Sequence, residues 1–137
     1  MNYWILKTDT DAYSFDDLER DRRAVWDGVS NALALKHIRA MAPGDRALIY
    51  HSGDDKALVG FARIASAPYQ DPKHKESKLV VVDIESEGRL PKRVSLTTIK
   101  TDPAFADFIL VRQPRLSVVP VSPAQWKRLV TLGGHPE

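Results

Sequence analysis

Alternating apolar and polar residues along the chain predict several short β-strands. The strongest run is Lys78–Glu87, where Val80, Val82 and Ile84 fall on one face. Tyr3–Thr8 has apolar residues on both faces, which predicts a central strand. The other predicted strands are Arg46–His51, Ala57–Ser66, Arg89–Val94 after a turn at Gly88, and Ser117–Val121.

Helix caps and turn residues separate these strands. Ser14 is a good N-cap for a helix over Phe15–Arg20, and Asn31 for one over Ala32–Met41. Gly53-Asp54-Asp55 predicts a hairpin. The remaining predictions are short helices over residues 95–100, 102–106 and 124–132, a sharp turn over residues 43–45, and a strand-ending turn over residues 69–72 beside a pocket mouth.

The order of the predicted strands and helices limits the fold classes that the chain can adopt. Strands and helices do not alternate regularly, which argues against a doubly wound parallel sheet. We therefore predict an α+β fold: a small, curled, mixed and mainly antiparallel β-barrel with short flanking helices. With 137 residues and no flexible linker, residues 1–137 are predicted to form a single domain.

Composition adds limits on class and location. The chain is 43% hydrophobic and 28% charged, and it lacks cysteine, which excludes disulfides and thiolate metal sites. Its N-terminal residues do not resemble a signal peptide, and no apolar run approaches the roughly 20 residues of a membrane span. These features predict a cytoplasmic protein without a membrane partner.

The charge pattern is more informative than the net charge of +2, which is too small to predict tight non-specific DNA binding. Acidic residues crowd positions 9–21, whereas basic residues collect at positions 73–78, 92–93 and 112–115. This distribution allows one basic face. The alternative is a set of scattered, solvated charges.

Three short polar and aromatic signatures stand at the edges of apolar runs. They are Trp26-Asp27-Gly28-Val29-Ser30-Asn31, Tyr50-His51-Ser52 and Leu110–Val118. Their side chains can stack on, hydrogen-bond to and neutralise a small planar or anionic ligand. The signatures therefore favour a binding module over an enzyme.

Each signature also has a purely structural interpretation. Trp26 is either a stacking surface for a base or a core residue, and Asn31 either reads a base edge or caps a helix. Arg112 and Arg115 either bind phosphate or a base edge, or form a salt bridge to an acid such as Asp27 or Asp83.

Enzymatic and metal-binding patterns are weak. His51 and Ser52 are adjacent, but neighbouring strand residues point to opposite faces, and no G-x-S-x-G elbow is present. The four histidines show no metal-ligand spacing, and no glycine-rich phosphate loop occurs. We expect no metal and no cofactor.

The chain resembles the EVE-domain family in the order and spacing of its motifs. The matching segments run from near residue 3 to near residue 132 and include Tyr3–Lys7, Tyr13–Leu18, Trp26–Val29, Asn31, Gly44-Asp45, Tyr50–Ser52, Val59-Gly60, Tyr69–Asp71, Leu110–Gln113, Arg115–Val118, Pro120-Val121 and Trp126. The resemblance implies a PUA-like fold and a DNA- or RNA-binding function in which a modified base is flipped into an aromatic pocket without chemistry on it.

By position, the resemblance implies a primary and a secondary set of ligand-binding residues. The primary set is Trp4, Trp26, Asn31, Tyr50, Ser52 and Arg115, and the secondary set is Lys7, His51, Arg112 and Gln113. The chain departs from the family pattern at five places: Thr8-Asp9-Thr10 stands where Ser-Glu-Pro is usual, Ser30 where a basic residue is usual, Leu33 and Leu35 where Gln and Arg are usual, and Pro114 where Ser is usual. Two cationic positions are thus lost near the expected pocket.

Three hypotheses follow. The first is a non-catalytic, monomeric reader of a modified base in DNA or RNA, working beside proteins that act on modified nucleic acid. The second is a small hydrolase or nuclease-like enzyme that uses Asp27, His51 or Ser52, and it requires a carboxylate within hydrogen-bond reach of His51. The third is a domain that binds a metabolite or a protein partner on the same barrel.

Overall fold

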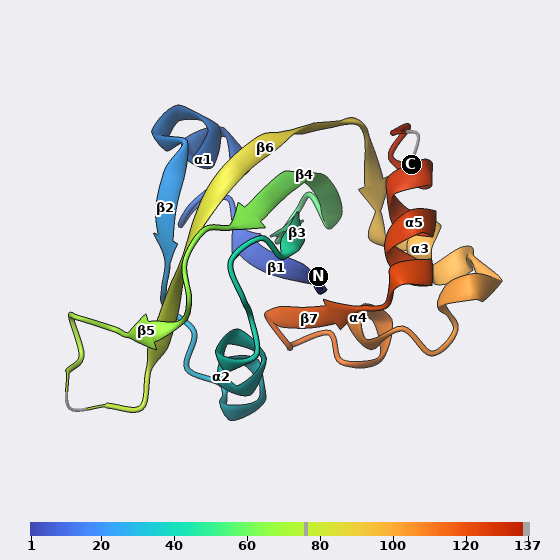
Figure 1. Cartoon of the computed structure of the whole chain (residues 1–137). Coiled ribbons are helices and arrows are strands. Elements are labelled where there is room, and N and C mark those ends of the chain that lie inside the picture. The colour runs from blue at the N-terminus through green and yellow to red at the C-terminus, as the bar shows by residue number, and fades with distance from the viewer. Residues whose placement is uncertain (76, 136–137) are drawn as a thin grey trace.

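The computed structural model describes residues 1–75 and 77–135. A curved sheet has the strand order β2-β6-β4-β3-β1-β7, and β5 pairs with β6 (Figure 1). The strands are β1 (Tyr3–Asp9), β2 (Arg23–Trp26), β3 (Arg46–Ser52), β4 (Ala57–Ile64), β5 (Tyr69–Gln70), β6 (Val80–Ser95) and β7 (Val118–Val121). The helical segments are α1 (Phe15–Asp21), α2 (Ala32–Arg39), α3 (Leu96–Thr101), η1 (Pro103–Phe105), α4 (Ile109–Arg112) and α5 (Pro123–Leu132).

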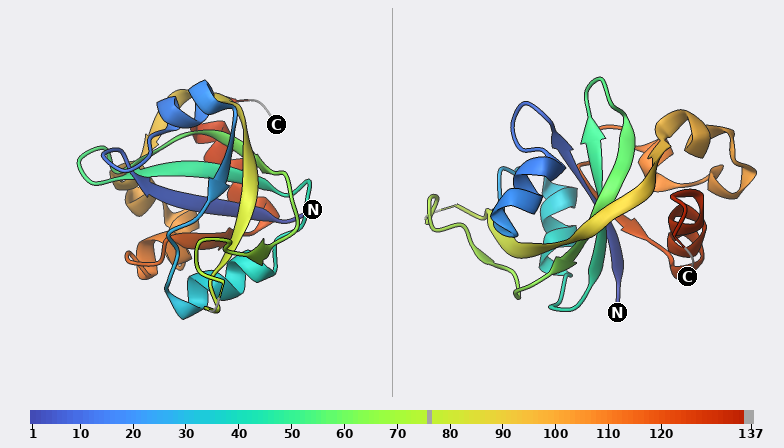
Figure 2. Two further views of the ribbon diagram at one scale, coloured as in Figure 1. Left: turned by 90° about the vertical axis from the view of Figure 1, so that its left-hand side faces the viewer. Right: turned by 90° about the horizontal axis from the view of Figure 1, so that it is seen from above.

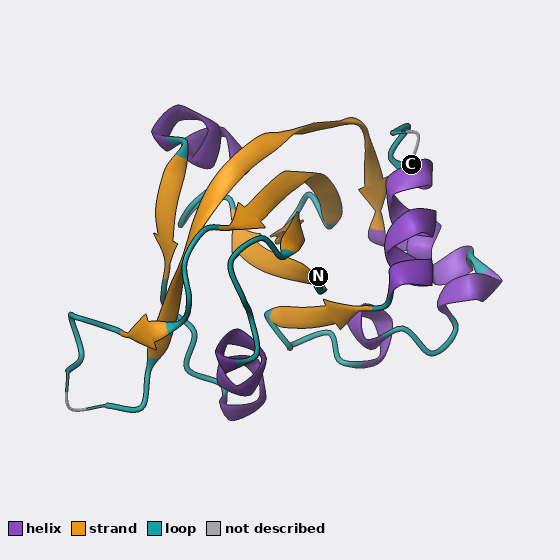
Figure 3. Cartoon of the chain, viewed as in Figure 1, coloured by secondary structure: helices purple, strands orange, loops and turns teal. Residues whose placement is uncertain are grey.

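The sheet is mixed but mainly antiparallel, as predicted. β1 lies between β3 and β7, pairing in parallel with β3 and antiparallel with β7. All other strand pairs among the described residues are antiparallel, including the predicted β3–β4 hairpin. Short helices surround the curled sheet (Figures 2 and 3), so the predicted α+β class is confirmed.

The strand β6 differs from the prediction of two strands divided by a turn. It runs without interruption from Val80 to Ser95, and Gly88 adopts a φ of +105° inside it. The pairing with β4 changes register on both sides of Gly60. The positive φ of Gly88, which the sequence pattern assigned to a turn, is accommodated within a bulged and bent strand. The predicted turn at Gly88 is therefore wrong.

Three short elements were not predicted. β2 has four residues and β5 only two, and the latter replaces the predicted turn over residues 69–72 at its first two positions. Both pair with the long strand β6. The one-turn helix α4 has no side-chain cap hydrogen bond. Such elements have too few residues for a periodic pattern, and tertiary pairing defines them.

The N-terminus of the first helix, α1, is fixed by a capping box and by a buried ring, and the loop before it carries residues of the site. Ser14 and Asp17 form a capping box, which confirms the predicted cap. The ring of Phe15 is fully buried and lies directly over Gly60 of β4. The loop that joins β1 to α1 is therefore held between a strand end and an anchored helix.

Candidate nucleic-acid interface

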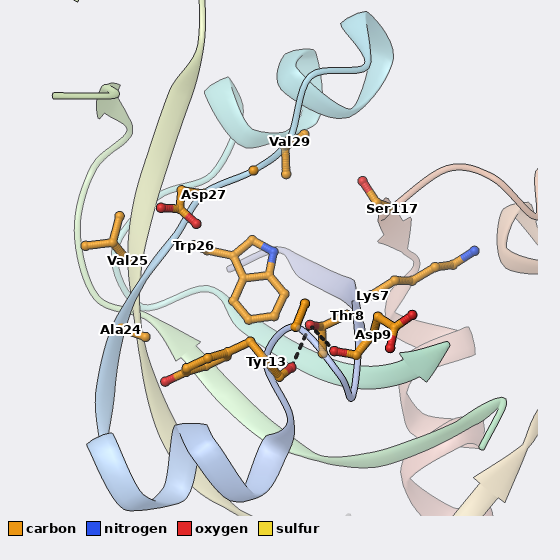
Figure 4. A pocket seen from close by; sticks show the side chains of 12 residues that line it. Lys7, Thr8, Asp9, Tyr13, Ala24, Val25, Trp26, Asp27, Val29 and Ser117 are labelled. Carbon is orange, nitrogen blue, oxygen red and sulfur yellow. Dashed lines mark hydrogen bonds between the residues drawn. The ribbon is translucent and has the colours of Figure 1, made fainter. Parts of the chain in front are cut away.

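A hollow of about 430 Å³ opens between the end of β1 and the edge strand β2 (Figure 4). This volume falls within the roughly 300–1,000 Å³ range of small-molecule sites. We call it the Trp26 pocket. Its lining residues are Lys7, Thr8, Asp9, Ala12, Tyr13, Ala24, Val25, Trp26, Asp27, Gly28, Val29 and Ser117.

Two aromatic rings form a corner in this pocket. Trp26 and Tyr13 have ring centroids 6.5 Å apart and planes at 79° to each other, an edge-to-face arrangement. Trp26 is 7% exposed. Its indole nitrogen faces Val29 and Ser117 in Figure 4, and the indole N–H has no hydrogen-bond partner among the described residues. The corner thus offers ring surface and one unused donor.

The position of Tyr13 follows from local hydrogen bonds. The Thr8 hydroxyl donates to the Tyr13 carbonyl at 2.6 Å, and the Tyr13 hydroxyl donates to Asp21 at 2.8 Å. Burial, together with the hydrogen bond to Asp21, raises the pKa of Tyr13 to about 12. Tyr13 therefore stays neutral and fixed across the physiological pH range.

Trp26 is held in place by the pairing of β2 with β6. Arg23, at the start of β2, donates to Asp83 and Glu85 of β6 at 2.9 Å each. Tyr69 donates to the second oxygen of Asp83 at 2.6 Å. The hydrogen bonds from Tyr69 and Arg23 lower the pKa of Asp83, and the bond to Asp83 raises that of Tyr69 to about 12.

The free energy of unfolding of the parent protein should increase as the pH is raised from about 3 to about 6, and we expect this increase to be smaller in Asp83→Asn. A carboxyl whose pKa is lowered by folding stabilises the protein above its unfolded pKa of about 4, and this stabilisation disappears as pH falls through the folded pKa. Urea unfolding of both proteins across this range measures the effect. The two proteins should converge at the acid end, and parallel curves would contradict the assignment.

Lys7 connects the Trp26 pocket to a neighbouring hollow. Its ammonium donates to the Pro114 carbonyl at 3.0 Å and lies 5.6 Å from the centroid of the Tyr50 ring. Burial lowers the pKa of Lys7. The neighbouring hollow, of about 300 Å³, is lined by Lys7, Tyr50, Ser52, Gly53, Lys56, Leu96, Lys100, Leu110 and Pro114. We call it the lysine hollow.

A comparison with known families classifies this arrangement. The model of the EVE domain family matches residues 2–132. The chain belongs to the EVE-domain family. Mouse thymocyte nuclear protein 1 is 28% identical, with 96% of this chain and 73% of the mouse protein aligned.

Solved structures share the fold of this EVE domain. The Rhodopseudomonas palustris protein Rpa0253 is 38% identical, with a TM-score of 0.93 over 98% of this chain and 94% of that one. Human THYN1 protein, solved in complex with DNA containing 5-methylcytosine, has a TM-score of 0.91 and 21% identity, with 100% of both chains covered. The PUA-like α+β architecture implied by the sequence resemblance is thereby established.

The structure brings the predicted ligand-binding residues of the EVE domain together in three adjoining groups. Trp26 and Lys7 line the Trp26 pocket, and Lys7 meets Tyr50 and Ser52 in the lysine hollow. A third hollow, also of about 300 Å³, is lined by Asn31, Leu33, Gln113, Pro114, Arg115 and Leu116. Because Lys7 and Pro114 each line two of these hollows, the three are contiguous.

Three of the predicted residues lie outside these groups: His51, which is described below, and Trp4 and Arg112. Trp4 is 5% exposed, and its indole N–H donates to the buried carboxylate of Asp45 at 3.1 Å. The guanidinium of Arg112 donates to the Ala106 carbonyl and lies 3.3 Å from Asp107. Both side chains thus have structural partners in the described chain, and a ligand contact for either remains only a prediction.

Other predicted residues combine a structural contact with a place beside a hollow. The Asn31 side-chain oxygen accepts from the backbone N–H groups of Leu33 and Ala34, which confirms its role as the N-cap of α2. Its amide nitrogen has no partner among the described residues, so it is still available as a donor. The Ser52 hydroxyl donates to the Thr8 carbonyl at 3.2 Å.

His51 has the carboxylate neighbour that the enzyme hypothesis requires. Its Nδ1 lies 3.0 Å from Asp55, and the bond to His51 is the main cause that lowers the pKa of Asp55. However, Nε2 accepts from the backbone N–H of Phe15 at 2.9 Å, and the residue is 4% exposed. This geometry assigns the proton to Nδ1 and leaves no free ring nitrogen to act as a base.

Several pocket residues were missed as ligand-binding candidates. Tyr13 enters the sequence prediction only through the family motif, and Ser117 only as a member of the Leu110–Val118 signature and as the start of a strand. Asp27, considered as an ion-pair partner of an arginine, instead lies 3.6 Å from Lys73. No local pattern marks Tyr13 as a wall of the pocket, because its neighbour Trp26 lies on an edge strand that the sequence did not predict.

Within residues 1–75 and 77–135, no helix is long and apolar enough to cross a membrane. In the same residues, no group of three or more histidine, cysteine, aspartate or glutamate side chains could hold a metal ion.

Proposed function

We propose that this EVE domain is a non-catalytic DNA-binding module that takes a modified base, flipped out of the stack, into the Trp26 pocket. The aromatic corner of Trp26 and Tyr13 is the observation that supports the proposal most directly. A flipped base is recognised by stacking and by hydrogen bonds to its edge. The pocket offers ring faces, the free indole N–H, and carboxylate acceptors on Asp9 and Asp27.

The family relationship supports DNA as the polymer. The human THYN1 protein, which shares this fold, was solved with DNA that contains 5-methylcytosine. Aspartate is an acceptor suited to the exocyclic amine of cytosine, which makes 5-methylcytosine the first base to test. The absence of catalysis is supported by His51, whose ring nitrogens both contact structural groups.

We expect Trp26→Phe to weaken binding of 5-methylcytosine DNA by about tenfold or more, because base stacking on an aromatic ring contributes roughly 1–3 kcal/mol. Phenylalanine keeps an apolar ring at the position but removes the indole N–H and part of the stacking area. Fluorescence anisotropy with a methylated oligonucleotide measures the affinity, and thermal unfolding reports the stability of the variant.

Trp126→Phe is the matched control, because Trp126 is a buried indole on α5 that stacks on Tyr3 rather than lining the pocket. It should lose stability without losing DNA affinity. Equal affinity of the parent and Trp26→Phe for methylated DNA would overturn the assignment of the pocket. Stronger binding of a methylated RNA, or of the free nucleoside, would replace DNA with that ligand.

A further inference from the structure

The lysine hollow is a strongly cationic concavity. It lies between the β3–β4 hairpin tip and the α3–α4 region, next to the Trp26 pocket. Three of its nine lining residues are the lysines Lys7, Lys56 and Lys100, and none of the nine carries a carboxylate. Ser52 and Tyr50 add hydroxyl groups. The chemistry of the lining is therefore suited to an anion.

The three lysines lack charge partners in the part of the chain that the structure describes. Most of its arginines, by contrast, are paired, for example Arg23 with Asp83 and Arg128 with Asp102. The acid nearest in sequence to Lys56 is Asp55, and its carboxylate contacts His51 and Arg93 instead. Unpaired like charges that share a concave surface repel one another, so an anion bound between them would be stabilised.

The lysine hollow adjoins the Trp26 pocket, because Lys7 lines both. An ammonium group has three donor hydrogens, and one of those on Lys7 is used by the Pro114 carbonyl at 3.0 Å. Two donors remain. The hairpin tip is held against the end of β1, where the Ser52 hydroxyl donates to the Thr8 carbonyl. The hollow and the pocket therefore share one rigid rim.

We propose that Lys56 and Lys100, with Lys7, bind a backbone phosphate of the strand whose base enters the Trp26 pocket. This assignment rests on the proposed function. It places a phosphate contact in a hollow that shares Pro114 with the hollow of Asn31, whereas the basic residue that the family usually carries directly before Asn31 is replaced here by Ser30. A phosphate contact fixes the register of the strand without reading its sequence.

The test is the salt dependence of DNA binding by the Lys56→Gln/Lys100→Gln double variant. Neutralising one phosphate contributes about 0.7–0.9 to the slope of log affinity against log salt. We expect the slope to fall by about 1, with equal weakening of methylated and unmethylated oligonucleotides. The Lys56→Arg/Lys100→Arg variant keeps both charges and should retain the slope of the parent.

The control is Lys92→Gln/Lys127→Gln, which removes the same charge from exposed lysines near α5, away from the hollow. Equal slope changes in the two double variants would overturn the proposal, because the effect would then reflect net charge alone. An unchanged slope in Lys56→Gln/Lys100→Gln would also overturn it. Failure of the proposed base-reading function is distinguishable, since it removes the preference for methylated DNA in the parent protein itself.

Discussion

Replacing Gly60 by alanine is expected to lower the free energy of unfolding by about 3 kcal/mol, the upper part of the usual range for overpacking a core. A Cβ atom at this position would overlap Cζ of Phe15. The Phe15 ring is fully buried, and its backbone N–H is bound to His51. Because Phe15 begins α1, relief of the clash would also displace the helix. Urea unfolding measures the loss.

A second variant separates the steric cause from other effects of Gly60→Ala. Phe15→Leu removes the ring atoms that the new methyl group would meet, so alanine at position 60 should cost much less in that background. The double-mutant cycle should show a coupling of about 1 kcal/mol or more. Additive losses would contradict the proposed contact. DNA affinity should fall with Gly60→Ala as well, since α1 and its loop position Tyr13.

Replacing Asp45 by alanine is expected to destabilise the fold by about 3 kcal/mol, because buried donors left without an acceptor each cost about 1–3 kcal/mol. Asp45 is 3% exposed. Its carboxylate accepts from the backbone N–H groups of Asn2 and Ala42 at 3.0 Å each, and from the Trp4 indole at 3.1 Å. Chemical unfolding monitored by tryptophan fluorescence measures the change.

Two comparisons sharpen this result. Asp54→Ala changes an exposed aspartate with no hydrogen bond among the described residues, so its effect should stay within about 0.5 kcal/mol. Asp45→Asn keeps one acceptor oxygen and should fall between the parent and Asp45→Ala. A loss for Asp45→Ala no larger than that of Asp54→Ala would show that the three hydrogen bonds contribute little. Trp4 would then be available for a role other than anchoring the N-terminal strand.

The sequence predicted the helices and the hairpin that are stabilised by interactions between residues close together in the chain. Ser14 and Asn31 were identified as caps because a short polar side chain bonds to N–H groups two or three residues away. The β3–β4 hairpin followed from its glycine and aspartates, and the central place of β1 from apolar residues on both faces. The family motifs placed Lys7 and Trp26 among the site residues, and both line the Trp26 pocket.

The role of Tyr13 in the Trp26 pocket and the hydrogen bond of Trp4 could not be predicted, since the partners of both residues are distant in the chain. Tyr13 gains its place from Trp26, which lies on β2, and β2 is defined by pairing with β6 about 60 residues later. The family resemblance placed Trp4 among the ligand-binding residues by position, whereas the hydrogen bond from its indole to Asp45, 41 positions away, is set by the tertiary structure.

The sequence by itself determined the fold class, the family and the chemical types at the site, because these depend on periodicity, caps and motif spacing. Only the tertiary structure decided which side chains face one another. It set Trp26 against Tyr13, occupied both nitrogens of His51, and gathered Lys7, Lys56 and Lys100 in one hollow. Such contacts depend on strand pairing across long separations, and no local pattern of residues encodes them.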